Sequence, residues 1–296
     1  MVDVLKKTTV IGGNASEELA KKIAKKLKAS FVKTQVRVFP DGESKITLSK
    51  IQKSQHVIVV QSTYPPVDTN LIQVLSLVSK SKQIASKVTV AIPYMGYARQ
   101  DREFLPGEIV TMQVIAGLFK AVGVTNMIVV DIHSLIGLKH FKIKTKNVSA
   151  IPELASHFKK LKLKEPIVVS PDQGGKERAR IFADNLGVDH IALTKKRDRK
   201  TGKVQIMNGK LSQVIGRDLI IVDDMISTGG SIIKAAQFLK KQSCKRVYVA
   251  CTHALLMNDA ERRIKKAGVT QIISTNTIPG STSVVDVSNI IAKAIV

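Results

Sequence analysis

Two adjacent carboxylates, Asp223 and Asp224, precede a turn of small residues in the second half of the chain. The turn consists of Ser227, Thr228, Gly229, Gly230 and Ser231. Apolar residues at helical spacing follow, so the turn lies over a helix N-terminus, where backbone N–H groups favour phosphate. Carboxylates beside a phosphate need another partner, such as ribose hydroxyls or a metal ion. The pattern indicates a phosphorylated sugar as ligand; the alternative is an ordinary strand-to-helix turn in which the acids cap the helix.

Two further groups of polar residues follow predicted strands. Asp172 comes after strand 167–170 and begins a turn with two glycines, which let a ligand approach the backbone. It is a candidate metal ligand, or else part of a plain capped helix start. Asp131 and His133 come after strand 124–130, and if that strand continues they point the same way. A carboxylate and an imidazole would then reach one site, although a histidine here is more often a structural, hydrogen-bonded residue.

Two loops carry side chains that could contact a ligand. Arg99, Gln100 and Asp101 leave the end of strand 88–92, and strand ends are where open parallel sheets bind ligands. The arginine could form a bidentate pair with phosphate, and the glutamine could bond to a ribose or base. As an isolated charged loop the segment would simply be solvated. The second loop is 39–43, for which turn chemistry alone is a sufficient explanation.

A run of cations, residues 194–203, lies between strands 190–193 and 204–207. Such a run is normally a solvated hairpin. Phosphoryl transfer, however, needs movable cations that neutralise the transition state, and no other predicted loop supplies them. Lys195 and Arg197 are therefore the candidate catalytic residues.

Strands and helices alternate along the whole chain, which predicts an α/β protein whose mainly parallel sheets are flanked by helices. With 296 residues the chain is long enough for two domains, and we place them at 1–147 and 148–296. The halves resemble a degenerate repeat. In this hypothesis helix 110–119 with the strand after it corresponds to helix 232–241 with strand 247–251.

The formal net charge of +24 admits a polyanionic partner or a lysine-covered surface. The basic residues are spread over predicted helix faces without an arginine-rich arm, which favours a solvated surface and makes nucleic acid an unlikely partner. No apolar run reaches the roughly 18 residues of a membrane span, and the N-terminus lacks a signal peptide's apolar core. We therefore expect no membrane contact and a cytoplasmic location.

Taken together, five motifs in order resemble the ribose-phosphate diphosphokinase family, whose domains have the type I phosphoribosyltransferase fold. The motifs are Phe-Pro-Asp-Gly-Glu at 39–43, Arg-Gln-Asp at 99–101, Asp-x-His at 131–133, Ser-Pro-Asp-x-Gly-Gly at 170–175 and the acids with their loop at 223–231. The resemblance implies that ATP donates its β,γ-diphosphoryl group to the 1-hydroxyl of ribose 5-phosphate, giving 5-phosphoribosyl 1-diphosphate and AMP for nucleotide biosynthesis. It also implies Mg²⁺ and a homo-oligomer in which the 39–43 turn serves a neighbouring subunit.

The same resemblance implies roles for individual residues. ATP would be bound by Phe39, Asp41, Gly42, Glu43, Arg99, Gln100, Asp101 and His133. Ribose 5-phosphate would be bound by Arg197, Asp223, Asp224, Ser227, Thr228, Gly229, Gly230 and Ser231. Metal would be held by Asp131, His133 and Asp172, and Lys195 and Arg197 match the family's catalytic Lys-x-Arg.

The resemblance to the diphosphokinase family weakens at residues 135–139, where many family members have a glutamine and a further aspartate. Two other functions stay open. A phosphoribosyltransferase would consume the product at the same loop, but it gives no reason for the ATP-type turns. A non-catalytic regulator or nucleic-acid-binding protein would explain the charge, but not the intact Lys195, Arg197, Asp172 and His133.

Overall fold

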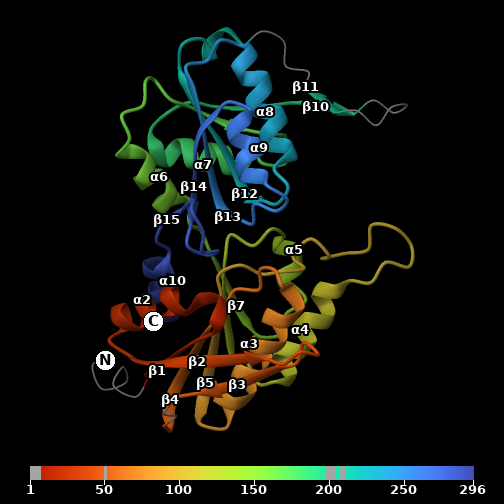
Figure 1. The fold of residues 1–296 in the computed structure, drawn as a ribbon, viewed down its shortest axis with the longest axis vertical. Coiled ribbons are helices and arrows are strands. Elements are labelled where there is room, and N and C mark those ends of the chain that lie inside the picture. The colour runs from red at the N-terminus through yellow and green to blue at the C-terminus, as the bar shows by residue number, and fades with distance from the viewer. Residues whose placement is uncertain (1–7, 50–51, 198–203, 207–210) are drawn as a thin grey trace. The chain divides into compact units, whose positions relative to one another are not determined.

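The computed structural model describes residues 8–49, 52–197, 204–206 and 211–296 (Figure 1). The contacts divide the chain into two compact units. Unit 1 comprises residues 1–149, 277–279 and 287–296, and unit 2 comprises 150–276 and 280–286. The division differs from the expected domains 1–147 and 148–296, because the C-terminal helix returns to unit 1. Helix periodicity could predict that this helix exists but not which sheet it covers.

Unit 1 is built on a seven-stranded sheet, counted over the described residues, in the order β3-β2-β1-β4-β5-β6-β7. Its strands are β1 (Thr8–Gly12), β2 (Ser30–Val38), β3 (Ser44–Leu48), β4 (Ser54–Val60), β5 (Ala85–Ile92), β6 (Asn126–Val130) and β7 (Lys144–Val148). Its helices are η1 (Asn14–Ser16), α2 (Glu17–Leu27), α3 (Val67–Lys82), α4 (Thr111–Ala121), α5 (Leu135–Leu138) and α10 (Ser288–Ile295). All paired strands are parallel except β2 and β3, which form an antiparallel hairpin.

Both faces of this sheet are buried, as its near-continuous apolar strands predict. On one face Val57 and Val59 pack with residues of α3 and α4. The alternate residues Ile58 and Val60 are equally buried but belong to the other face. There α2 and α10 lie side by side, in contact with β1, β6 and β7 (Figure 1). The fully buried Ile291 of α10 anchors the chain's end in unit 1.

Unit 2 contains a six-stranded parallel sheet, again among the described residues, in the order β15-β14-β13-β12-β8-β9. Its strands are β8 (Ile167–Ser170), β9 (His190–Ala192), β12 (Asp218–Ile226), β13 (Arg246–Ala254), β14 (Val269–Thr275) and β15 (Ser283–Val285). Its helices are α6 (Ile151–Lys159), α7 (Lys176–Leu186), η2 (Ser212–Val214), α8 (Gly230–Lys241) and α9 (Ala260–Lys266). β10 (Lys195–Arg197) and β11 (Val204–Ile206) form a separate antiparallel ribbon (Figure 1).

Alternate residues of the unit 2 strands face two apolar layers. Leu219 and Ile221 of β12 pack with α8 and α9, whereas Ile220 and Val222 pack with α6 and α7. Side chains that follow each other in a strand point to opposite faces, so a strand with an apolar residue at every position needs a cover on both sides. The sheet has that cover, and the predicted α/β architecture is confirmed.

The two sheets repeat one topology, but not with the pairing that the sequence suggested. The unit 1 sheet, listed from β2, has the order β2-β1-β4-β5-β6-β7. The unit 2 sheet, listed from β9, has the matching order β9-β8-β12-β13-β14-β15. By position β6 corresponds to β14 and α3 to α8. The expected match of helix 110–119 with helix 232–241 is therefore wrong by one strand-helix unit, because similar apolar periods recur in every unit and only sheet order distinguishes them.

This topology identifies the segment of unit 1 that corresponds to the glycine-rich loop. After β4 come Gln61 and Ser62, where β12 carries its acids. The Gln61 side chain accepts a hydrogen bond from the Ala15 N–H at 3.0 Å, and the Ser62 hydroxyl donates to the Thr277 carbonyl at 2.7 Å. Uncharged side chains thus fill this strand end in unit 1 and satisfy its backbone. Within the described part of the chain, no helix is long and apolar enough to span a bilayer.

Candidate functional site

The two carboxylates of unit 2 lie near the end of β12 and share one arginine. Arg178, from α7, donates to Asp223 Oδ1 at 3.1 Å through Nη1, and its Nη2 lies 3.3 Å from Asp224 Oδ1. The Asp224 backbone N–H also donates to Asp223 Oδ1, at 3.0 Å. None of the expected site residues is Arg178, although it lies only a few residues after the Asp172 turn. Its position in the first helical turn after those glycines was the available signal.

Burial and repulsion make Asp223 costly to ionise. Its side chain is 21% exposed, and its strand neighbour on β13 is the buried Cys251. Burial, followed by the charge of Asp224, raises the pKa of Asp223 to about 7, while the Arg178 guanidinium opposes the shift. Burial likewise raises the pKa of the Cys251 thiol. The ionised form of Asp223 is therefore destabilised, and a hydrogen-bond donor or a cation placed beside it would stabilise its charge.

The glycine-rich turn has the conformation that an anion loop needs. Gly229 has φ +75° and precedes α8, and a Cβ there would lie 2.8 Å from Ile264 of α9. Only glycine fits this left-handed, crowded position. Gly230, the first residue of α8, is exposed, and a Cβ on it would meet nothing within 4 Å. The first N–H groups of a helix have no intrahelical acceptors, and a helix N-terminus that borders open space suits an anion.

The carbonyls of the same turn are held by the protein. Ser227 accepts from the Met257 N–H at 3.0 Å, Thr228 from Arg263 Nη2 at 2.7 Å, and Gly229 from the Ile233 N–H at 2.9 Å. These bonds fix the orientation of the peptide groups. The negative ends of the loop dipoles are therefore occupied, which favours an anion on the N–H side.

Asp172 shapes the second glycine turn, at the end of β8. Its Oδ1 accepts the Gly175 N–H at 3.2 Å, and its carbonyl accepts the Ser170 hydroxyl at 2.6 Å. A Cβ on Gly175 would lie 2.6 Å from that hydroxyl oxygen, so glycine is required here. An ionised carboxylate offers about four acceptor sites, so one bond to a backbone N–H does not exclude a ligand. The capping role and a ligand role for Asp172 are compatible.

The expected nucleotide residues of unit 1 fall into different environments. Arg99 and Gln100 are exposed at the loop that follows β5. Asp101 is only 4% exposed: its carboxylate accepts the Ser134 hydroxyl, and its carbonyl bonds with His140 Nε2 at 2.8 Å. Asp101 thus ties the loop to the segment after His133. Its side chain points inward, unlike those of Arg99 and Gln100.

Asp131 and His133 do not continue a strand. β6 ends at Val130, and Asp131 has φ +37°, outside the strand region. The Ile132 N–H donates to the side chain of Asn147 in the neighbouring strand β7, at 3.0 Å. The condition for aligning the two side chains by strand alternation, a strand that continues through His133, is therefore not met. His133 is exposed and Asp131 half-buried in the turn that follows β6.

The turn 39–43 joins β2 to the edge strand β3. The Phe39 N–H donates to the Glu43 carbonyl at 2.8 Å, the Glu43 N–H to Asp41 Oδ1 at 3.1 Å, and Gly42 has φ +94°. Asp41, Gly42 and Glu43 are exposed. The Arg37 guanidinium lies 5.2 Å from the centre of the half-buried Phe39 ring. The predicted tight turn is present, and it leaves its acidic side chains accessible.

The cation run begins as a strand. Lys195 pairs with Ile206 and Arg197 with Val204 in the antiparallel β10–β11 ribbon. The remaining cations of the run, residues 198–203, lie outside the described residues, as does Met207, the expected end of the second strand. The described residues thus contain paired strand residues on both sides of the predicted hairpin.

A metal site made of protein ligands alone is not found. Among the described residues, no three His, Cys, Asp or Glu side chains come together in a way that could hold a metal ion. Mg²⁺ usually takes one or two carboxylates and fills its shell with substrate phosphates and water. The absence of such a cluster among the described residues is therefore compatible with an ion that arrives with a phosphate ligand, and the expected metal roles of Asp131, His133 and Asp172 stay predictions.

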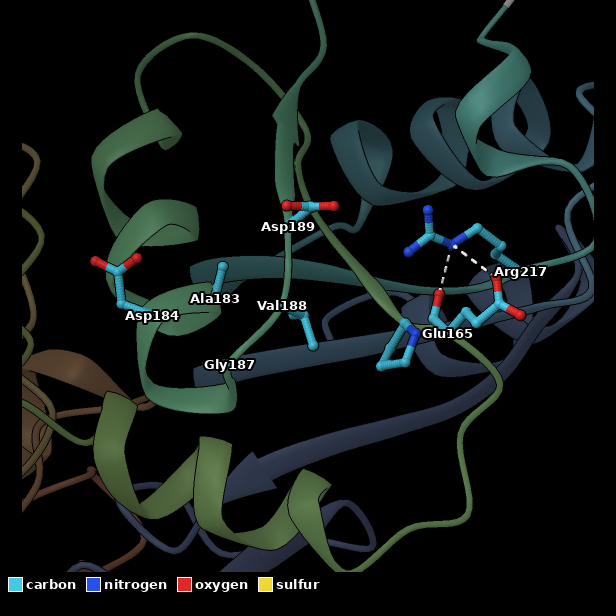
Figure 2. A pocket seen from close by; sticks show the side chains of 8 residues that line it. Glu165, Ala183, Asp184, Gly187, Val188, Asp189 and Arg217 are labelled. Atoms are coloured by element: carbon cyan, nitrogen blue, oxygen red, sulfur yellow. Dashed lines mark hydrogen bonds and ion pairs between the residues drawn. The ribbon is translucent and has the colours of Figure 1, made fainter.

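Unit 2 also has a cavity that is not the site. Its volume is about 520 Å³, and its lining includes Glu165, Asp189 and Arg217 (Figure 2). Arg217 Nε donates to the Glu165 carbonyl at 2.7 Å. Glu165 lies two residues before β8, and Asp189 and Arg217 immediately precede β9 and β12, so the cavity lies at the amino ends of the strands. Ligands of open parallel sheets bind at the carboxyl ends, where the acids and the loop lie.

Fold and site together define a protein with two phosphoribosyltransferase-type α/β domains, one of which carries acids and a glycine loop at its strand ends. Residues 8–123 match the family model of the N-terminal domain of ribose phosphate pyrophosphokinase, and residues 143–286 match the phosphoribosyl transferase domain. The ribose-phosphate pyrophosphokinase of Sulfolobus acidocaldarius is 38% identical over 290 residues, which are 97% of this chain and 99% of that protein. The chain therefore belongs to the ribose-phosphate pyrophosphokinase family, and it is an enzyme.

Two further relatives agree with this assignment. The ribose-phosphate pyrophosphokinase of Vibrio cholerae is 35% identical over 97% of this chain and 94% of its own length. The crystal structure of phosphoribosylpyrophosphate synthetase from Mycobacterium smegmatis has a TM-score of 0.85 at 28% identity and covers 98% of both chains. The family resemblance and the fold class expected from the motifs are confirmed.

The raised pKa of Asp223 predicts a gain in stability when its charge is removed. A folded-state pKa above the ordinary value of 3.8 means that the native state loses stability as pH rises from about 4 to about 7. Asp223→Asn should therefore raise the free energy of unfolding at pH 8 by on the order of 1 kcal/mol, and by much less at pH 5. Denaturant unfolding at both pH values measures this. A loss of stability at pH 8 would contradict it.

The two loop glycines should respond differently to alanine. Gly229→Ala should lower the free energy of unfolding by about 1–3 kcal/mol, because the residue is left-handed and crowded by Ile264. Gly230→Ala, the matched control, should change it by less than about 0.5 kcal/mol. Thermal unfolding of both variants gives the comparison, and equal effects would show that the loop adopts another conformation.

Proposed function

We propose that the chain transfers the β,γ-diphosphoryl group of ATP to the 1-hydroxyl of ribose 5-phosphate, with the residues assigned below. One observation carries the proposal: Asp223 and Asp224 are followed by a loop whose carbonyls accept hydrogen bonds from the protein and whose Gly230 borders open space at the start of α8. An anion site next to two carboxylates matches a ligand with a phosphate at one end and hydroxyls at the other.

In unit 2, the 227–231 loop and the α8 N-terminus bind the 5-phosphate. Asp223 and Asp224 accept hydrogen bonds from the ribose hydroxyls, which orients the sugar and its 1-hydroxyl. The half-buried Asp223 favours this ligand because hydroxyl donors replace the water that burial has removed. The attacking oxygen is thereby held by groups that do not themselves react, so the acceleration comes from positioning.

In unit 1, the exposed Arg99 and Gln100 bind ATP, the arginine at phosphate and the glutamine at ribose or base. Asp101, buried beneath them, supports the loop through Ser134 rather than touching the nucleotide. Phe39 offers a ring face for adenine, and Asp41, Gly42 and Glu43 supply the turn with its acceptors. We further propose a homo-oligomer in which this exposed turn serves a neighbouring subunit.

Mg²⁺ is the proposed cofactor: together with ligand phosphates, His133 and Asp131 of unit 1 would hold it at one position, and Asp172 of unit 2 would hold it at a second position. When bound, it neutralises phosphate charge and draws the phosphate oxygens into a fixed arrangement. The Gly175 N–H fixes the orientation of the Asp172 carboxylate, which suits this role because an oriented ligand needs less reorganisation when the ion arrives.

Lys195 and Arg197 are the proposed catalytic residues, and Arg197 also contributes to ribose 5-phosphate binding. Attack at the β-phosphorus spreads negative charge over the transferring group, and fixed cations stabilise that charge. Both residues lie on β10, which is joined to unit 2 through a short segment after β9. A two-stranded ribbon can move as one piece, which suits groups that close over a bound ligand.

The activity is tested by incubating the protein with Mg²⁺, ATP and ribose 5-phosphate and separating the nucleotides. We expect AMP, formed only when the sugar is present, in amounts equal to the diphosphorylated product. ADP in place of AMP would indicate an ordinary sugar kinase. No turnover, combined with consumption of 5-phosphoribosyl diphosphate by a nucleobase, would support a phosphoribosyltransferase.

Lys195→Ala should reduce kcat on the order of 10³-fold, as expected for a group that stabilises transition-state charge. Lys196→Ala is the matched control, since it removes the same charge at the adjacent position, and a much smaller loss is expected. Steady-state kinetics with both substrates near saturation provide the comparison. Near-normal turnover of the Lys195 variant would remove this residue from the mechanism.

A further inference from the structure

Arg178 has contacts that neither the motifs nor the reaction account for. It comes from α7, and through separate nitrogens it reaches one oxygen of each site carboxylate, at 3.1 Å and 3.3 Å. The contact to Asp223 joins residues 45 positions apart in the chain. The guanidinium is 26% exposed, and Asp223 and Asp224 are 21% and 6% exposed. All three charged groups are therefore substantially shielded from solvent, and ion pairs in such surroundings are stronger than pairs in open water.

The neighbouring glycine turn lies against this arginine. A Cβ on Gly175 would lie 3.4 Å from Arg178 Nη1, in addition to its 2.6 Å clash with the Ser170 hydroxyl. Arg178 lies in the first turn of α7, which begins at Lys176. The Asp172 turn thus places a cation beside the acids of β12. Because the Asp172 turn sets where α7 begins, it also sets the distance between Arg178 and the acid pair.

The acids need such a partner because they follow each other in one strand. Side chains of successive strand residues point to opposite faces of the sheet. Earlier in β12 this alternation is seen directly, because Ile221 packs under α8 and α9 and Val222 packs under α6 and α7. The two carboxylates nevertheless both reach the guanidinium of Arg178, at 3.1 Å and 3.3 Å. Arg178 therefore bridges their Oδ1 atoms and holds them on one side.

We propose that Arg178 is a positioning residue for ribose 5-phosphate: by holding Asp223 and Asp224 through one oxygen each, it turns both carboxylates towards the ribose hydroxyls. The proposal rests on the proposed function of the acid pair and adds the residue on which their orientation depends. Arg178 acts through the acids and touches neither phosphate nor the reacting atoms. Lysine cannot replace it fully, because a single ammonium lacks the fork that spans two acceptors.

The test compares Arg178→Lys and Arg178→Met with Arg180→Met. Arg180 lies on the same helix but pairs with Glu177 and Asp184 away from the acids, and it is 46% exposed. For both Arg178 variants we expect KM for ribose 5-phosphate to rise about tenfold to a hundredfold, as for loss of a charge-assisted hydrogen bond. The lysine variant should be the milder, and KM for ATP should stay within about twofold. Arg180→Met should change neither constant.

A double-mutant cycle separates positioning from general damage. Calorimetric titration with ribose 5-phosphate gives the dissociation constants of the parent, Asp223→Asn, Arg178→Lys and the combined variant. If Arg178 acts through Asp223, its substitution costs at least about threefold less when Asp223 is already asparagine. Additive losses, or equal rises in KM for both substrates, would overturn the proposal.

Failure of the proposed function would be recognised separately. If the parent protein formed AMP and bound ribose 5-phosphate, but Arg178→Lys and Arg178→Met bound the sugar as the parent does, only the role of Arg178 would be wrong. If the parent bound no ribose 5-phosphate, the assignment of the acid pair itself would be wrong, and the role of Arg178 would be wrong with it. Arg178→Lys retains the charge, so it keeps the test decisive even where the methionine variant does not fold.

Discussion

Repulsion between two neighbouring carboxylates is the constraint on which the unit 2 site depends. Asp223 and Asp224 are half-buried or buried at a strand end, where their charges would oppose folding without a partner. The raised pKa of Asp223 records that cost, and Arg178 offsets part of it. A site that is destabilising when empty gains free energy when hydroxyl or cationic ligands arrive. In the proposed function, the stability lost by burying these two charges is the source of part of the affinity for ribose hydroxyls.

The parallel sheet makes such a site possible, because it brings the carboxyl ends of β8 and β12 together. β8 ends in the Asp172 turn, which sets the start of α7 and hence the place of Arg178. β12 carries the acids near its end and is followed by the loop, whose Ser227 and Thr228 carbonyls accept hydrogen bonds from Met257 and Arg263. The ligand-facing features of unit 2 are therefore supported by contacts from other elements.

Unit 1 shows the same topology without the acids. At the end of β4, Gln61 and Ser62 bond to backbone groups and leave no charge to be neutralised. Its candidate ligand groups lie instead after β5 and β6, and Asp101 links these two segments through Ser134 and His140. The two units share the packing of strands and helices, whereas their candidate ligand-binding groups lie at different strand ends. This is the expected result when a buried sheet is constrained by packing and its loops are not.

The sequence by itself determined the alternation of strands and helices, the glycine-rich turn over α8, and the tight turn at 39–43, because each depends on residues that are close together in the chain. Its motifs also identified the family, which the comparisons confirm. Only the tertiary structure decided that Arg178 meets Asp223, that Asp101 faces inward, that Asp131 leaves the strand, and that α10 belongs to unit 1. These features depend on contacts between elements distant in sequence. Periodicity along the chain shows which face of an element is apolar, but not which other element will cover it.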